Sequence, residues 1–166
     1  MKKLSAIAIL VIGFAASSNA QSTASASASA TIISPISITK TVDLNFGNVG
    51  ASALAGTVTI TPAGARSVTG GASLPSTAGT VAAASFDVAG QSNYTYAITL
   101  PASVVISSGP DNMTVNGFTN NVGPIGTLSA GGTQTLTVGA TLNVGATQAA
   151  GTYISATPFD VTVNYN

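Results

Sequence analysis

The chain has 166 residues, of which only 5% are charged, and it contains no cysteine, no histidine and no glutamate. Four basic and four acidic side chains give a formal net charge of zero, which excludes the basic footprint of a nucleic-acid or anionic-membrane protein. Without cysteine the fold cannot rely on disulfides, so burial and backbone pairing must stabilise it. The length suits one domain of ordinary size.

The first twenty residues have the pattern of a signal peptide. Two lysines precede an apolar stretch, Leu4–Ala16, and Ser18–Ala20 supplies the small residues that a signal peptidase needs. The apolar stretch is shorter than the roughly 20 residues that span a bilayer. We therefore predict removal of residues 1–20 and export through the periplasm, with no membrane insertion of the mature chain. That chain would carry two basic residues and four aspartates, a net charge of −2.

An alternating segment follows directly after the predicted cleavage site. Its even positions are apolar and its odd positions are serine or threonine, which is the periodicity of a strand with two different faces. The apolar positions are Ala24, Ala26, Ala28, Ala30 and Ile32. Most of these side chains are too small to build a core, and Pro35 separates them from the rest. We predict an N-terminal arm over residues 21–34 and a domain over residues 35–166.

Three interpretations of the arm stay open at this point. It is a strand donated to the sheet of another molecule, the first strand of its own sheet, or a flexible linker rich in serine and alanine. The alternation continues through Ile38, which favours a strand of the chain's own sheet, whereas Pro35 favours a break between arm and domain.

Beyond Pro35 the chain consists of short alternating runs separated by glycine, proline and asparagine, and helix formers are scarce. This pattern predicts an all-β sandwich. The stretch Gly70–Gly79 is predicted to be a loop. The predicted strands are Ile36–Phe46, Gly56–Thr61, Ala84–Val88, Tyr94–Leu100, Val104–Ser107, Met113–Phe118, Thr133–Val144 and Phe159–Tyr165.

The sequence offers no catalytic or metal-binding pattern. Without histidine and cysteine, the usual zinc and transition-metal ligands are missing, and a Ser-His-Asp triad cannot form. The four carboxylates stand far apart in the sequence, and none belongs to a calcium loop; they are Asp43, Asp87, Asp111 and Asp160. We therefore expect a protein that is not an enzyme and that has no cofactor and no metal site.

The C-terminal segment resembles two known families. Ala149–Tyr153 reads Ala-Ala-Gly-Thr-Tyr, and the alternating strand Phe159–Tyr165 ends in Val-Thr-Val-Asn-Tyr. This ending is similar to that of archaic chaperone-usher pilins and of spore coat protein U-type domains. The mature chain also resembles a bacterial domain-of-unknown-function family of small exported proteins, over most of residues 30–166. The matching pieces are Ile36–Lys40, Leu44–Gly47 and Leu128–Gly139.

These resemblances imply an exported, immunoglobulin-like, pilin-like β-sandwich with an extended N-terminal arm. Such a sandwich lacks one strand, which a periplasmic chaperone supplies first and the arm of the next subunit supplies later, at an outer-membrane usher. On this resemblance the even-numbered apolar residues of the arm would be inserted into the next subunit. The acceptor groove and the chaperone contact would be formed by Phe159, Val161, Val163 and Tyr165.

The resemblance therefore implies a structural subunit that forms a homo-polymer by strand addition, as a fimbrium on the cell surface or in the extracellular space. The alternative is a monomeric exported or cell-surface β-sandwich with an adhesive or ligand-binding role. An exported enzyme is a third class, but no residue pattern supports it.

Overall fold

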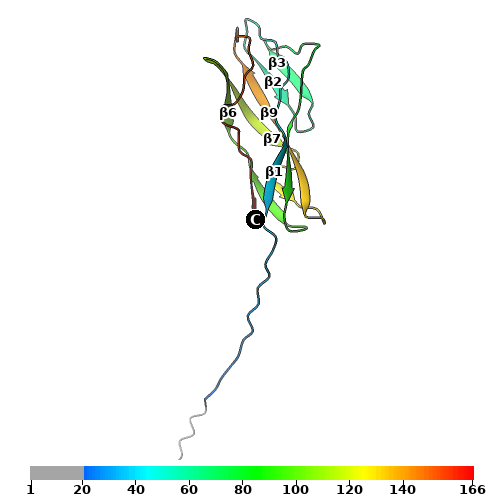
Figure 1. Cartoon of the computed structure of the whole chain (residues 1–166), viewed down its shortest axis with the longest axis vertical. Helices are drawn as coiled ribbons and strands as arrows, with labels where there is room; N and C mark the ends of the chain where they lie inside the picture. Colours follow the sequence, from blue (N-terminus) through cyan, green and yellow to red (C-terminus); the bar gives the residue numbers. More distant parts are fainter. Residues whose placement is uncertain (1–20) are drawn as a thin grey trace, which may run out of the picture. The chain divides into compact units, whose positions relative to one another are not determined.

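The computed structural model describes residues 21–166 (Figure 1). The predicted signal peptide, residues 1–20, lies outside the described residues. The chain separates into two units, Met1–Ile32 and Ile33–Asn166. In the described part of the first unit, residues 21–32, no strand is assigned and every side chain is exposed. The second unit contains ten strands, and no helix occurs in residues 21–166, so the all-β prediction is confirmed.

The ten strands form two sheets, and all their pairings are antiparallel. The larger sheet contains β1 (Ser37–Val42), β2 (Gly56–Ile60), β3 (Arg66–Gly70), β4 (Ala84–Ala89), β6 (Ser103–Ser108), β7 (Asp111–Asn120) and β9 (Thr133–Val144). Its main path is β1-β4-β9-β2-β3, and β7 joins β6 to β9. The smaller sheet has the order β10-β5-β8, formed by β10 (Thr162–Tyr165), β5 (Thr95–Thr99) and β8 (Ile125–Thr127).

Strand β9 organises the larger sheet because it changes partner along its length. Its first half, up to Val138, pairs with β4, and its second half, from Ala140, pairs with β2. Between them lies Gly139, where an added Cβ would collide with the carbonyl oxygen of Ile60. Since β7 pairs with β9 opposite both halves, β4 and β2 share one edge of β9.

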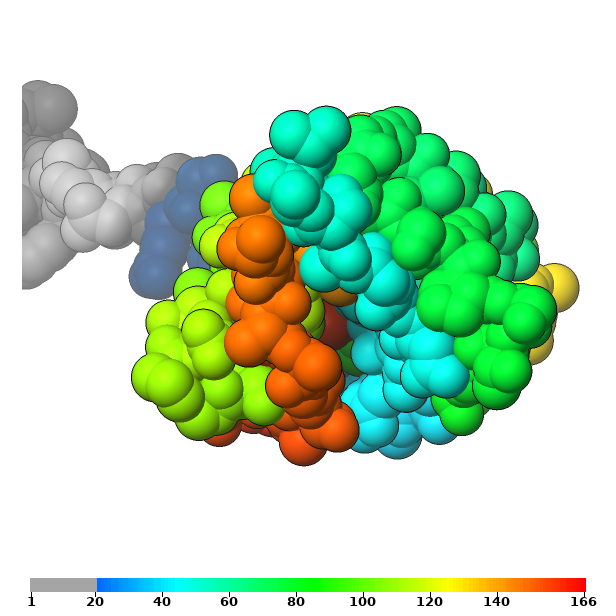
Figure 2. Space-filling view, turned by 90° about the horizontal axis from the view of Figure 1, so that it is seen from above, coloured from blue at the N-terminus to red at the C-terminus, as the bar shows by residue number. Residues whose placement is uncertain are grey.

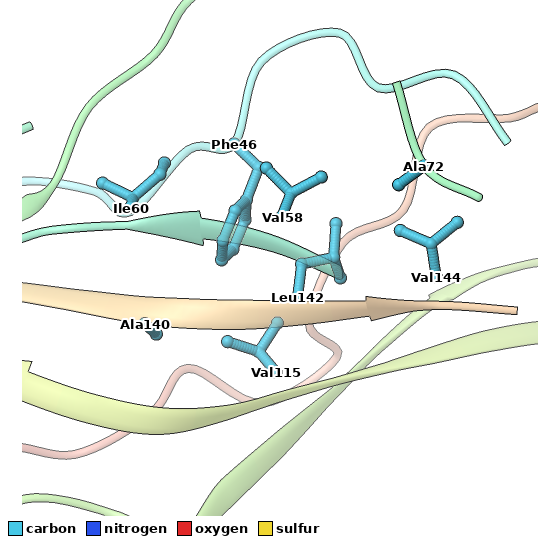
Figure 3. Close-up of a cluster of buried hydrophobic side chains, with 8 residues drawn as sticks. All are labelled: Phe46, Val58, Ile60, Ala72, Val115, Ala140, Leu142 and Val144. Carbon is cyan, nitrogen blue, oxygen red and sulfur yellow. The ribbon is translucent and has the colours of Figure 1, made fainter. Parts of the chain in front are cut away.

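The buried side chains form two clusters at the two ends of β9. The second cluster lies between the two sheets and consists of Ala84, Phe86, Val88, Tyr96, Leu128, Leu136, Val138 and Val163. The first cluster, drawn in Figure 3, consists of Phe46, Val58, Ile60, Ala72, Val115, Ala140, Leu142 and Val144. No residue of the smaller sheet belongs to the first cluster. One end of the larger sheet is therefore left without a facing strand from the smaller sheet.

The predicted strands agree with the structure in most of their positions, and Thr133–Val144 agrees in full. The first predicted strand, Ile36–Phe46, ends earlier, at Val42, and the last, Phe159–Tyr165, begins only at Thr162. Two strands were not predicted, β3 and β8. The predicted loop is confirmed from residue 71 to residue 79, where the chain forms only an isolated bridge between Ser73 and Gly50.

Candidate functional site

A groove of about 1180 Å³ lies over the first cluster. One side is formed by Asp43–Ala51, the N-terminal wall, and the other by segments of Gln148–Phe159, the C-terminal wall. Figure 2 shows the hollow from one end, between the cyan and orange parts of the chain. The floor is apolar and is formed by Phe86, Val104, Ile106, Met113, Val115, Leu142 and Val144.

The N-terminal wall uses its outer edge for pairing with the rest of the domain. Asn45 exchanges two backbone hydrogen bonds of 2.9 Å with Ala82, and Gly50 exchanges two of 2.9 and 2.8 Å with Ser73. In an extended chain, neighbouring residues direct their backbone groups to opposite edges. Accordingly, the backbone groups of Leu44 and Val49 make no hydrogen bond within residues 21–166. These groups belong to the edge on the groove side.

An arginine side chain adds to the contacts that position the N-terminal wall. The Nη1 atom of Arg66, on β3, donates to the carbonyl oxygens of Phe46 at 2.7 Å and of Asn48 at 2.9 Å. Between these residues Gly47 has a φ of 69°, and a Cβ there would collide with the carbonyl oxygen of Ala78. The wall is thus positioned by contacts with β3 and with Ala78.

The C-terminal wall is attached to the domain through the edge strand β6. Ile154 exchanges two backbone hydrogen bonds of 3.0 and 2.9 Å with Ser107. The hydroxyl of Tyr153 donates to the carbonyl oxygen of Ala149 at 2.8 Å. Among the described residues, the backbone groups of Tyr153 and Ser155 have no hydrogen-bond partner. By the same alternation they lie on the edge opposite β6, which is the groove side.

The two walls run in opposite directions. The N-terminal wall continues from β1, and five successive antiparallel pairings lead from β1 through β4, β9, β7 and β6 to the C-terminal wall. A strand laid between the walls would therefore be parallel to one wall and antiparallel to the other. Each wall offers backbone donors and acceptors to such a strand.

Among the described residues that line the groove, the charged side chains lie at one end. There Lys40 and Asp43 form an exposed ion pair with 2.6 Å between Nζ and Oδ1, an arrangement that contributes little to stability in water. Residues 21–166 contain no cluster of three potential metal-ligating side chains among histidine, cysteine, aspartate and glutamate. Burial raises the pKa of Tyr96, but this side chain lies in the second cluster. The groove thus offers a binding surface of apolar side chains and backbone edges.

Within residues 21–166 nothing helical has the length and apolarity that a membrane crossing requires.

The predicted site residues occupy different parts of the structure. The five predicted donor residues are exposed, Ile32 by 92%. Of the predicted acceptor residues, Phe159 lines the groove, with its ring centroid 5.0 Å from that of Phe118. Val161, Val163 and Tyr165 belong to the second cluster or pack against it. The contact of these residues with a chaperone or an arm stays a prediction.

The floor residues on β6, β7 and β9 were not singled out from the sequence. The signal was present in their alternation, since Val104 and Ile106 face inward while Val105, between them, is exposed. Alternation indicates which face is apolar, but it does not reveal whether another strand covers that face.

A family model described as a domain of unknown function, DUF4402, matches residues 36–165. No curated protein and no solved structure matches the chain. The matched range contains both walls and the floor of the groove, and it begins after the arm.

Proposed function

The chain belongs to the DUF4402 family, a domain of unknown function, and we propose that it is an exported, non-enzymatic structural subunit that polymerises by donor-strand exchange. In this proposal the domain is an immunoglobulin-like, pilin-like sandwich that lacks one strand. The arm of a second copy occupies the groove and supplies that strand. The observation that carries the proposal is the groove itself, which has an apolar floor between two walls whose backbone groups at Leu44, Val49, Tyr153 and Ser155 have no hydrogen-bond partner among residues 21–166.

The alternating part of the arm matches the N-terminal wall in number of residues. The segment Ala24–Ile32 has as many residues as the N-terminal wall, Asp43–Ala51, and each spans about 30 Å when extended. No strand is assigned to the arm, so its backbone is available for two ladders. Each net hydrogen bond would contribute about 1 kcal/mol, against a similar cost per residue for ordering the arm.

The side chains of the arm also suit the site. With Ala24, Ala26, Ala28 and Ala30 toward the floor, the inserted backbone can lie close to the apolar residues below it. Ile32 is the largest apolar side chain of the alternating set and would bury the most apolar area. The odd-numbered serine and threonine side chains would then face solvent.

We propose partners and a location for this subunit as well. A periplasmic chaperone would cover the groove before assembly, and an outer-membrane usher would deliver the homo-polymer to the cell surface as a fimbrium. An apolar floor of this kind favours protection until the donor strand arrives.

Deletion of residues 21–33 tests the proposed function. We expect the deletion to abolish fibres in electron micrographs while the circular dichroism spectrum keeps its β-sheet signature. The matched control replaces the same residues with a glycine-serine segment of equal length, which we also expect to abolish fibres. Normal fibres from either variant would overturn the proposal, and a stable monomer of the full-length protein in sedimentation would favour a ligand-binding or adhesive domain.

A further inference from the structure

The point where the arm joins the domain is fixed by a closed set of hydrogen bonds. The hydroxyl of Tyr165 donates to the carbonyl oxygen of Ser34 at 2.9 Å and accepts from the backbone nitrogen of Gln91 at 2.5 Å. The backbone nitrogen of Ser34 donates to Oε1 of Gln91 at 3.2 Å. The chain therefore enters the domain beside its own C-terminus, as Figure 1 shows for the start of β1.

This entry point and the end of the groove at Ala51 and Val144, which we call its mouth, lie at opposite ends of β9. Ser37, just after the entry point, pairs with Ala89, and Ala89 pairs with Thr133 at the start of β9. The groove reaches Val144, at the end of β9, and Ala51, at the end of its N-terminal wall. Twelve strand residues separate the two ends of the domain by roughly 35 to 40 Å.

The chain between the arm and the domain is too short to hold two subunits apart. Ile32 precedes Ser34 by two residues, which span at most about 7 Å. When Ile32 of one copy lies in the mouth of the groove of another, Ser34 of the first copy must lie within about 7 Å of that mouth. The entry end of one domain and the mouth end of the next are then in contact.

We propose that these two ends form a second interface between copies, in which the loop Ala51–Ala55 of one subunit packs against the turn Gln91–Tyr94 of the next. This inference rests on the proposed function, because it requires Ile32 to occupy the groove. It adds a contact between folded domains to the insertion of the arm, and this contact would set the angle between neighbouring subunits.

The chemistry of both ends suits a second copy of the chain. Neither Ala51–Ala55 nor Gln91–Tyr94 contains a charged residue, so no charge has to lose its water shell on contact. Leu54 is 71% exposed at one end and Tyr94 is 44% exposed at the other. The Tyr94 ring lies edge-on to Tyr165, with centroids 5.7 Å apart. Burying these two side chains against each other removes apolar area from water.

Cross-linking between introduced cysteines tests the interface, because the chain has no cysteine of its own. The test variant carries Leu54→Cys and Ala130→Cys. Ala130 is exposed in the turn after Ser129, whose carbonyl oxygen accepts from Asn93 at 3.2 Å. The control variant carries Leu54→Cys and Ser67→Cys, because Ser67 is exposed on β3 and pairs with Thr59 of β2, which pairs with the second half of β9. Assembled full-length protein is treated with a short bismaleimide and separated by denaturing electrophoresis.

We expect a ladder of covalent oligomers from the test variant and no such ladder from the control variant. Fibres in electron micrographs without a ladder from the test variant would overturn the second interface and leave the proposed function standing. Equal ladders from both variants would also overturn it, because they would indicate random collisions. If the full-length protein without cysteines forms no fibres although it is folded, the proposed function fails, and the second interface fails with it.

Discussion

The guanidinium of Arg66 donates a hydrogen bond of 2.7 Å to the carbonyl oxygen of Phe46, whose side chain belongs to the first cluster. The same Nη1 atom also reaches the carbonyl oxygen of Asn48. Through these hydrogen bonds β3 holds the backbone of the N-terminal wall. Strand β3 is an edge strand and is far from the C-terminal wall in sequence. The width of the groove therefore depends on a side chain that does not line it.

Replacement of Arg66 tests this role. Arg66→Met removes both hydrogen bonds and should lower the free energy of unfolding by about 1 to 3 kcal/mol, measured by denaturant titration. Because the N-terminal wall loses its anchor, we also expect a lower yield of fibres. The control is Lys40→Met, which removes only an exposed ion pair and should change the free energy of unfolding by less than about 1 kcal/mol. Equal effects of the two changes would contradict the role of Arg66.

Two neighbouring side chains on β6 lie on opposite faces of the sheet. Ile106 lines the groove, whereas Val105 is 51% exposed on the other face. Ile106→Thr places a hydroxyl in the apolar floor, and we expect it to weaken assembly. Val105→Thr, with its side chain outside the groove, should leave assembly unchanged. Fibre yield in sedimentation distinguishes them, and an equal loss from both variants would speak against the groove as the binding site.

The arm offers a similar pair of positions. Ile32→Ala removes the largest even-numbered side chain and should weaken the polymer by about 2 kcal/mol, or roughly 30-fold in its dissociation constant. The free energy of unfolding of the domain should stay the same, because Ile32 is exposed in the unassembled chain. Thr31→Ala changes an odd position and should have little effect on either quantity. Polymer dissociation is measured by dilution and sedimentation, and a larger effect of Thr31→Ala would contradict the predicted facing.

Stability at high pH depends on Tyr96 in the second cluster. Burial raises the pKa of Tyr96 above its ordinary value of 10.0, and its hydroxyl donates to Oε1 of Gln134 at 2.6 Å. The folded state therefore holds this proton more tightly than the unfolded state. The stabilisation is fully present below pH 10 and is lost as the pH rises through the folded-state pKa.

We expect the melting temperature of the wild-type protein to fall above pH 10. Tyr96→Phe should be less stable at neutral pH, because Gln134 loses its partner, but its melting temperature should fall less between pH 9 and pH 11. A Tyr153→Phe control keeps Tyr96 and should show the full alkaline loss. Identical alkaline curves for wild type and Tyr96→Phe would exclude Tyr96 as the cause.

The long strands could be predicted from the sequence, but the groove could not. Thr133–Val144 alternates over twelve residues, so its period was clear. Strand β3, Arg66–Gly70, has a single apolar residue, Val68, and β8 has three residues with a glycine at its centre. Both depend on neighbours in the sheet for their conformation.

The walls of the groove could not be predicted from the sequence, because most of their residues lie outside regular strands. Asp43–Ala51 and Gln148–Phe159 are distant in sequence and are positioned by Arg66 and by the bridge between Ser107 and Ile154. No local pattern encodes such contacts. The alternate residues of Phe159–Tyr165 are apolar. The later ones, Val161, Val163 and Tyr165, pack in or against the second cluster.

Amide hydrogen exchange shows directly whether an inserted arm pairs with both walls. The measurement compares the assembled full-length protein with the variant that lacks residues 21–33. We predict that amides on the groove side, at Leu44, Val49, Tyr153 and Ser155, become protected in the assembled protein and exchange rapidly in the variant. The amide of Ile154, bonded to Ser107 on the other edge, should be protected in both. Equally rapid exchange of the groove-side amides in both samples would show that no inserted arm pairs with the walls.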